Sequence, residues 1–295
     1  MTNPMISTSL ARVLKDAPLT ANDGIVSYLD RVETGQAREQ GDRDAVMERH
    51  RNRSVEEIMR EVARHHGLTV MSEQAREFRG RFSEDEWIID IGGGTGWYWR
   101  GTRGANVLLA DFSRETLRVA ARLLKPEDRV HLMHCDASRL PILTGALSGV
   151  WSVQVFQHFP EPVLAGVLQE LRRVLLPDFG AKVFNLNPAL LLRAAYRLMG
   201  RRYHRRGEWN GLLLNCLTAE DWRARLAPWL VNEDAGRISV RYSELFFHPP
   251  LRLKPRRYPL KLEQVLARVP ELARLFARQV SIEVERRSGA GGSRP

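Results

Sequence analysis

The 295-residue chain has few cysteines and no long apolar run, and each shortage excludes a class of protein. Cys135 and Cys216 are the only cysteines, and two isolated thiols form neither a disulfide framework nor a Cys/His metal-binding pattern. No apolar run reaches the ~18 residues that a membrane span needs. The nearest run, 188–200, is short and is interrupted by Arg193 and Arg197. We therefore expect two reduced thiols, no metal site and no transmembrane segment.

The first twenty residues also lack the uninterrupted apolar segment of a secretory signal. Together with the sparse cysteine, this predicts a cytoplasmic protein. An apolar content of 43% and a charged content of 27% are ordinary for a globular protein. A chain of this length can bury a sizeable core, either as one enlarged α/β domain or as a core with an appended region.

Positive charge is concentrated in the last third of the chain. Residues 1–192 carry 24 Lys and Arg against 25 Asp and Glu, whereas residues 193–295 carry 21 against 10. Such an excess attracts an anionic partner only where the charges share one face. The densest basic segment, RRYHRRGEW at 201–209, is equally consistent with a solvated surface loop and with an anion-binding lid.

From residue 87 onward, short β-like runs alternate with amphipathic helical segments. Strands are predicted at 87–90, 106–111, 130–136, 149–154, 181–185, 238–247 and 279–286, and helices at 114–124, 162–175 and 218–230. Ser113 is the expected N-cap of the first of these helices, and residues 54–57 form a capping box ahead of an earlier one. The alternation predicts an α/β fold with a doubly wound, mostly parallel, seven-stranded sheet.

A glycine-rich segment, IIDIGGGTG at 88–96, follows the first of these strands. Glycines allow a sharp turn in which backbone N–H groups face a ligand. The next strand ends at Asp111, and in doubly wound folds an acid there accepts hydrogen bonds from ribose hydroxyls. A dinucleotide fingerprint fails because Trp97 and Trp99 stand where its third glycine would fall, and the Gly-Lys-Ser/Thr of a P-loop is absent. The segment therefore predicts another adenosine-containing cofactor.

The spacing Asp90-x-Gly92-x-Gly94-x-Gly96 resembles the first motif of the class I S-adenosylmethionine-dependent methyltransferases. Later segments follow in the family's order: Asp111 in LLADFS, Asp136 in HCDASRLP, SVQVFQHF at 152–159, and LRRVLLPDFGAKVFN at 171–185 with a proline–glycine turn before the fifth strand. The chain looks most like the small-molecule enzymes of the ubiquinone/menaquinone-biosynthesis type. The resemblance covers 87–187 well and the last two strands loosely.

This resemblance implies S-adenosyl-L-methionine as the cofactor and assigns residues to it. Asp111 would meet the ribose and Asp136 the adenine amino group, while Val153 and Gln154 would line the pocket. The full set of implied cofactor contacts is Asp90, Gly92, Gly93, Gly94, Gly96, Asp111, Phe112, Asp136, Ala137, Val153 and Gln154. His158, just after the fourth strand, is either a general base or a packing residue. The aromatic residues 97–99 are more consistent with core and pocket wall than with a cation–π cage.

Four regions follow from this interpretation. Residues 1–80 are a helical extension and a candidate substrate cap, 81–187 the Rossmann-like cofactor-binding core, 188–286 a C-terminal half with the basic insertion and the last two strands, and 287–295 a disordered tail. The predicted activity is methyl transfer, at oxygen, nitrogen or carbon, to a small or lipid-linked molecule, and anionic molecules are among the acceptors that fit. Peripheral contact with a membrane fits the same charge pattern.

Two other functions stay open from the sequence. An RNA or DNA methyltransferase would use the basic C-terminal third, although no motif of base methylation is found. A non-catalytic protein on the same fold would have no need of the intact glycine loop and acids. The four arginines Arg201, Arg202, Arg205 and Arg206 are expected to hold an anionic part of the substrate.

Overall fold

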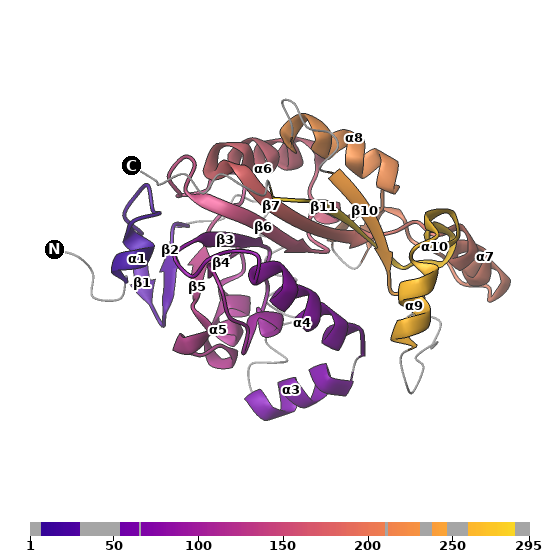
Figure 1. Ribbon diagram of the computed structural model, residues 1–295, viewed down its shortest axis with the longest axis horizontal. Helices are drawn as coiled ribbons and strands as arrows, with labels where there is room; N and C mark the ends of the chain where they lie inside the picture. The colour runs from indigo at the N-terminus through magenta and orange to yellow at the C-terminus, as the bar shows by residue number, and fades with distance from the viewer. Residues whose placement is uncertain are drawn as a thin grey trace.

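A computed structural model describes residues 7–29, 54–64, 66–209, 212–230, 238–246 and 259–286. Its centre is a mixed sheet of nine strands in the order β1-β2-β5-β4-β3-β6-β7-β11-β10 (Figure 1). The strands are β1 (Thr20–Asn22), β2 (Ile25–Ser27), β3 (Trp87–Ile91), β4 (Asn106–Asp111), β5 (Val130–His134), β6 (Leu147–Val153), β7 (Leu175–Leu186), β10 (Ile238–Ser243) and β11 (Gln279–Val284). The doubly wound, mostly parallel α/β fold is confirmed.

The prediction of seven strands is wrong by two. The extra strands, β1 and β2, form an antiparallel hairpin whose second strand pairs in parallel with β5. Asp23 and Gly24, both at positive φ, make the turn between them. Each strand has only three residues, too few for the alternation of apolar and polar residues to be recognised in the sequence. The hairpin is placed in the sheet because β2 pairs with the free edge of β5. The N-terminal region predicted to be helical therefore also contributes strands to the main sheet.

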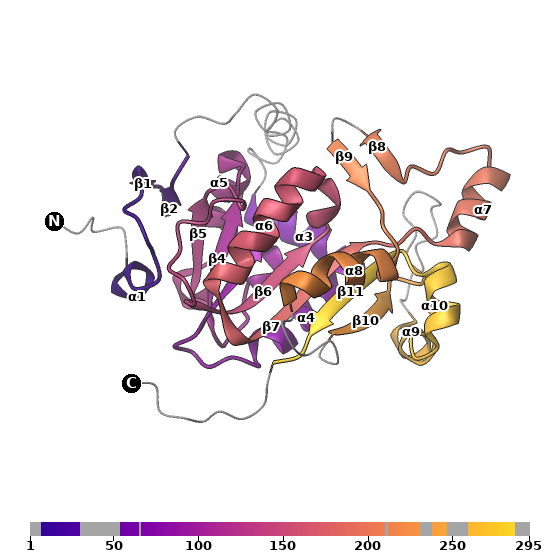
Figure 2. The same ribbon diagram turned by 90° about the horizontal axis from the view of Figure 1, so that it is seen from above.

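Helices cover both faces of the sheet (Figures 1 and 2). On one face lie α6 (Glu161–Val174) and α8 (Ala219–Leu230), and on the other α3 (Val55–Arg64), α4 (His66–Arg79) and α5 (Arg114–Leu123). Short α1 (Thr8–Ala11) lies beside the N-terminal hairpin, whereas α7 (Leu190–Leu198), α9 (Leu260–Leu266) and α10 (Pro270–Phe276) gather at the opposite end of the molecule. Among the helices that the structure describes, none has the length and apolar character to cross a membrane.

The predicted helix starts are confirmed in detail. The Ser113 hydroxyl accepts a hydrogen bond from the N–H of Thr116 at the start of α5. At the start of α3, Ser54 and Glu57 exchange backbone-to-side-chain hydrogen bonds of 2.9 and 3.1 Å. These bonds satisfy N–H groups that the first helical turn leaves without partners.

Two predicted loops contain strand. Residues 177–180, expected as a turn before the fifth strand, lie within β7; its pairing with β6 jumps from Leu147↔Leu175 to Gly149↔Gly180, so the extra residues bulge without ending the strand. Part of the basic loop pairs as β8 (Arg206–Trp209) with β9 (Leu212–Asn215) in a separate two-stranded sheet. Both strands form because the backbone pairs with another strand, and such pairing cannot be predicted from the local sequence. The predicted tail, 287–295, lies outside the described residues.

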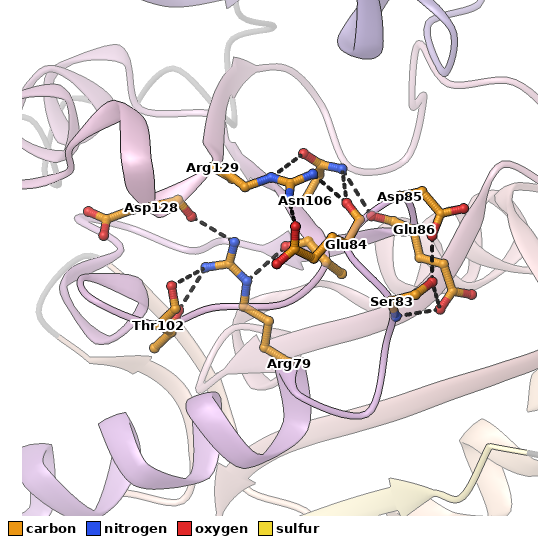
Figure 3. A network of polar contacts seen from close by, with 10 residues as sticks. Arg79, Ser83, Glu84, Asp85, Glu86, Thr102, Asn106, Asp128 and Arg129 are labelled. Atoms are coloured by element: carbon orange, nitrogen blue, oxygen red, sulfur yellow. Dashed lines mark hydrogen bonds and ion pairs between the residues drawn. The ribbon is translucent and has the colours of Figure 1, made fainter.

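A buried arginine fixes the amino-terminal edge of the sheet (Figure 3). Arg79, at the end of α4, is 0% exposed. Its guanidinium donates to the carbonyl of Ala105 at 2.8 Å, to the Thr102 hydroxyl at 2.7 Å and to the carbonyl of Asp128 at 2.7 Å. Burial lowers the pKa of Arg79 to about 10, which still leaves it charged near neutrality. This charge ties α4 to the segments that lead into β4 and β5.

Candidate functional site

The glycine loop after β3 is held at the carboxyl edge of the sheet by close packing. Gly92 and Gly96 both have positive φ, of 65° and 60°. A Cβ added at Gly92 would lie 2.4 Å from a methyl carbon of Val155, and one at Gly96 would lie 2.3 Å from Leu109. A side chain is therefore excluded at both positions by conformation and by space. The loop consequently packs directly against β4 and against the segment that follows β6.

Gly94 and Asp111, both predicted cofactor contacts, are in direct contact with each other. The N–H of Gly94 donates to Asp111 Oδ2 at 3.0 Å, and the N–H of Ser113 donates to Asp111 Oδ1 at 2.8 Å. A Cβ built on Gly94 would find no atom nearer than 3.9 Å, so space alone does not exclude a side chain here, although the positive φ of 58° disfavours one. The arrangement sets an acid and a backbone turn side by side, as recognition of a ribose at a strand end requires.

Asp90 lies beneath the glycine loop, and its carboxylate is 0% exposed. Oδ2 accepts hydrogen bonds from the Tyr98 hydroxyl and from Trp99 Nε1, both at 2.7 Å. Burial raises the pKa of Asp90 to about 7, because the charged form is poorly solvated, although the hydrogen bonds from Trp99 and Tyr98 oppose the shift. Asp90 thus fastens the aromatic segment to the floor of the loop.

The aromatic segment, η1 (Trp97–Trp99), is one turn of 3₁₀ helix. Tyr98 and Trp99 are core residues, 5% and 0% exposed, and the Trp99 ring stacks edge-on against Trp151 at 5.4 Å between centroids. Trp97 is half-buried and packs against Val119 and its neighbours on α5. The segment therefore fills the space under the loop with rings.

An unpredicted residue, His134, secures the next loop along the edge. Its Nε2 lies 3.1 Å from the carbonyl oxygen of Phe112, and its Nδ1 lies 2.8 Å from the Ser27 hydroxyl. A carbonyl can only accept, so in a neutral ring Nε2 carries the hydrogen and Nδ1 accepts from Ser27. The added hairpin thereby positions the residue that follows Asp111. Ser27 is brought here by the three-residue strand β2, which is too short to be predicted from a local pattern, so His134 could not be identified beforehand.

Asp136 and Ala137 follow β5, the next strand along the same edge. Asp136 Oδ1 accepts hydrogen bonds from both the N–H and the hydroxyl of Ser138, each at 2.8 Å. Asp136 is half-buried, and Ala137 packs against the core from a half-buried position. The turn fixes the carboxylate in one orientation at the rim of the sheet.

The end of β6 adopts a strained backbone. Gln154 has a positive φ of 57°, uncommon for a residue with a side chain, and its N–H donates to the carbonyl of Phe184 at 2.7 Å. The Ser152 hydroxyl donates to the carbonyl of Ile91 at 2.9 Å, which ties β6 to the end of β3. Val153 packs on the aromatic core. Strain of this kind clusters at ligand sites and is maintained by surrounding structure.

A cavity of about 590 Å³ opens beyond Gln154. Its walls combine apolar residues with basic and aromatic ones: Gln154, Gln157, His158, Leu186, Leu192, Tyr196, Arg201, Arg202, Tyr203, His204, Leu214, Cys216 and Arg278. Its size is that of a small-molecule site. Because Val155 contacts Gly92 and Gln154 lines the cavity, the cavity adjoins the glycine loop.

His158 faces this cavity with a defined ring orientation. Its Nδ1 lies 2.6 Å from the carbonyl oxygen of Leu213, to which it donates. Gln157 Oε1 accepts from the N–H of Leu186, so the amide nitrogen of Gln157 is the group 3.3 Å from His158 Nε2. In the neutral ring, Nε2 therefore carries the lone pair and faces the Gln157 amide group. The packing and catalytic interpretations of His158 are both compatible with this geometry.

The four arginines of the basic loop separate. Arg201 and Arg202 line the cavity beside His158, whereas Arg206 lines a different hollow of about 350 Å³ together with Arg225. Arg205 is half-buried, and its Nε is enclosed by protein. Arg206 pairs with Asn215 in the β8–β9 sheet and lines the other hollow with it, so it does not lie in the cavity wall with Arg201 and Arg202; the predicted role of the four arginines stays a prediction.

Comparison with known proteins adds an independent result. Residues 88–178 match the model of a family described as "Methyltransferase domain". Over 119 residues the chain is 35% identical to a demethylmenaquinone methyltransferase of Clavibacter sepedonicus. That alignment covers 38% of this chain and 47% of the relative, so the chain spans about half the length of the curated relative it matches.

Similar solved structures include two methyltransferases. A geranyl diphosphate C-methyltransferase from Streptomyces coelicolor is 15% identical, with a TM-score of 0.49 and coverage of 75% of this chain and 76% of that one. Phosphoethanolamine N-methyltransferase 2 of Haemonchus contortus is 16% identical, with a TM-score of 0.49 and coverage of 74% and 53%.

The buried Asp90 predicts an unusual dependence of stability on pH. Since its pKa is raised above the ordinary 3.8 to about 7, the stability that it contributes is complete below the ordinary value and is lost as the pH rises through about 7. Asp90→Asn cannot ionise, and its side-chain oxygen still accepts from Tyr98 and Trp99. The free energy of unfolding of the variant, relative to the unsubstituted protein, should therefore increase between about pH 5 and about pH 8.

Denaturant unfolding of both proteins across this range measures the effect. Parallel pH profiles for Asp90→Asn and the unsubstituted protein would mean that Asp90 ionises normally.

Proposed function

We propose that this chain, in which residues 88–178 form a methyltransferase domain of the class I S-adenosylmethionine-dependent type, transfers a methyl group to a small or lipid-linked molecule. One observation carries the proposal: the Gly94–Asp111 contact lies at the carboxyl edge of the sheet, and the same loop meets Val155 through Gly92, next to Gln154 in the wall of a cavity that also contains a histidine and arginines. Cofactor and acceptor sites at neighbouring strand ends are what group transfer requires.

The cofactor of this domain family, S-adenosyl-L-methionine, would supply an activated methyl group on a sulfonium sulfur. Asp111 and Phe112 would hold its ribose side, and Asp136 with Ala137 would hold the adenine. The loop from Gly92 to Gly96, together with Val153 and Gln154, would border its methionine end. The contact of the Gly94 N–H with the Asp111 carboxylate supports this use. Asp90 would act through the loop, because it lies fully beneath it.

The protein's own task is to align the acceptor and, where the acceptor carries a proton, to remove it. His158 Nε2 would accept that proton, and the Nδ1–H donated to the carbonyl of Leu213 would stabilise the resulting positive charge. The apolar walls from Leu186, Leu192 and Leu214 would exclude water from the acceptor. The same walls suit an acceptor with an apolar body.

Arg201 and Arg202 favour an acceptor with an anionic group. Both are exposed at the rim of the cavity and have neighbouring aromatic residues in Tyr196 and Tyr203. Planar guanidinium groups bind carboxylate and phosphate with two parallel hydrogen bonds. The acceptor class that we propose is therefore amphipathic, with an anionic end. The cytoplasmic location predicted from the sequence stays a prediction.

Cofactor binding gives the first test. Isothermal titration of the purified protein should show S-adenosylmethionine and its demethylated product binding in the micromolar range, about −7 to −8 kcal/mol. Asp111→Ala should weaken binding by about 1–3 kcal/mol, because a ribose–carboxylate pairing is lost. Glu127→Ala, an exposed acid of the opposite edge, should bind normally. Heat with a nicotinamide dinucleotide, and none with either of these two compounds, would reject the assignment.

His158 can be tested by a substitution that keeps its structural hydrogen bond. In His158→Asn the amide nitrogen can still donate to the carbonyl of Leu213, but the Nε2 lone pair is gone. Transfer of label from S-[methyl-³H]adenosylmethionine into a cell extract should fall roughly 10²–10⁴-fold, with unchanged cofactor affinity. Normal transfer by His158→Asn, with a loss of thermal stability in His158→Ala, would instead assign His158 to packing.

The split of the basic loop predicts unequal effects. Arg201→Gln with Arg202→Gln should lower label transfer at limiting extract concentration and recover at higher concentration, since binding of the acceptor is weakened. Arg206→Gln, on the other hollow, is the matched control and should transfer normally. Equal effects of both variants would argue against an anion site at the cavity. Label that appears in RNA or DNA would favour the nucleic acid alternative over a small or lipid-linked acceptor.

A further inference from the structure

We propose that α7, α9 and α10 form a surface that docks onto an anionic lipid bilayer. The docking itself does not depend on methyl transfer; only its consequence for access of the acceptor rests on the proposed function. The three helices lie together at the end of the molecule opposite the N-terminal hairpin (Figures 1 and 2). α10 packs between α7 and α9.

Exposed apolar side chains are concentrated on this surface. Eleven large hydrophobic side chains are exposed among the residues that the structure describes, and nine of them lie on these helices or in the adjoining turns. The nine are Leu190, Leu191, Leu198, Met199, Leu262, Val265, Val269, Leu272 and Phe276. Leu198 is 88% exposed. Contiguous exposed apolar surface of this kind marks an interaction site.

On α7 the exposed leucines form one stripe. At about 100° per residue, Leu190, Leu191 and Leu198 fall within roughly a quarter turn of one another. The opposite side of the helix carries Leu192 and Tyr196, which line the cavity. Core packing therefore explains only the inner side of α7, and the outer stripe is left for another partner.

The second stripe runs along α9 and α10. Leu262 and Val265 lie three residues apart on α9, Leu272 and Phe276 lie four apart on α10, and Val269 lies in the turn between the two helices, so each helix has two apolar residues at the spacing of one face. All five are exposed, by 38% to 58%. Each helix by itself is short, but together the two stripes present apolar side chains along the whole end of the molecule.

The charge around the stripes is positive. Residues 190–204 contain four arginines and no acid, and Arg193, Arg197, Arg201 and Arg202 are all exposed. Residues 260–278 contain four basic residues against two acids. One of these acids, Glu263, is buried and accepts hydrogen bonds from the N–H groups of Glu244 and Leu245. An apolar stripe flanked by arginine is the pattern of helices that lie in the interface of an anionic bilayer.

The same charge disfavours a second copy of the chain as the occupant. A twofold dimer through this surface would bring the two sets of arginines against each other. A bilayer that contains anionic lipid supplies both the apolar layer and the opposite charge.

The position of the surface has a consequence for the acceptor. α7 has leucines on its outer side and cavity residues on its inner side, and Arg201 and Arg202, directly after it, line the cavity. A lipid-linked acceptor can thus pass from the bilayer to the cavity along one helix. Its anionic end would meet the two arginines at the rim.

Co-sedimentation of the purified full chain with lipid vesicles tests the docking. The protein should bind vesicles with about a third phosphatidylglycerol, should be released as salt rises, and should bind pure phosphatidylcholine weakly. A triple change of Leu190, Leu191 and Leu198 to Gln should weaken binding at least about tenfold, since three apolar contacts with lipid are lost. The matched control changes Leu19 and Leu143, exposed elsewhere, to Gln and should bind as before.

Thermal unfolding and cofactor titration of the triple variant should match those of the unsubstituted protein, which excludes misfolding. Failure of the unsubstituted protein to bind either vesicle, or equal binding by the triple variant, would overturn the proposal. So would a dimer in sedimentation equilibrium that the triple variant abolishes, or salt-sensitive RNA binding without vesicle binding. Vesicle binding in a protein that binds no S-adenosylmethionine would keep the docking surface and reject the proposed function.

Discussion

The candidate site depends on the close approach of backbone segments at Gly92. Its N–H donates to the carbonyl of Ala110 at 2.7 Å, and the position of a Cβ is already filled by Val155. The ends of β3 and β4 and the segment after β6 can therefore meet at one point of the sheet edge. A side chain at Gly92 would collide with Val155 and would force the glycine loop apart from the segment that follows β6.

Buried polar groups hold the two edges of the sheet in different ways. At the amino-terminal edge, Arg79 uses a charge to join three segments of backbone, and it contacts no candidate site residue. At the carboxyl edge, Asp111 and His134 each bond the segment that follows a neighbouring strand, and Asp90 bonds the segment that follows its own strand. The contacts of Arg79 make the amino-terminal edge rigid. At the carboxyl edge, side-chain hydrogen bonds give the loops defined conformations.

The two sides of α7 illustrate how one element serves two surfaces. Leu192 and Tyr196 complete the cavity, while the outer leucines stay exposed among arginines. Both sides of this helix carry apolar residues, but the described part of the protein buries only the inner side. The cavity and the proposed docking surface are therefore separated only by α7.

Much of the fold and of the cofactor side of the site was determined by the sequence alone. The alternation of strand and helix, the caps at Ser54 and Ser113, and the run from Asp90 to Gly96 are local patterns, because a period or a cap depends on residues that are neighbours in the chain. Asp111 was found from its place at a strand end. For each of these residues, the secondary structure in which it lies is decided by residues that are close to it in the chain.

Tertiary structure decided the rest, because the deciding contacts join distant residues. The hairpin β1–β2 joins the sheet because β2 pairs with the edge strand β5. This pairing brings Ser27 to His134, which is 107 residues away in the chain. The separation of Arg206 from Arg201 and Arg202 follows from the pairing of β8 with β9. The motif predicts Asp90 as a cofactor contact, whereas in the structure Asp90 is buried beneath the loop, where it accepts hydrogen bonds from Tyr98 and Trp99. Burial and long-range pairing are properties of the folded chain, and no local pattern encodes them.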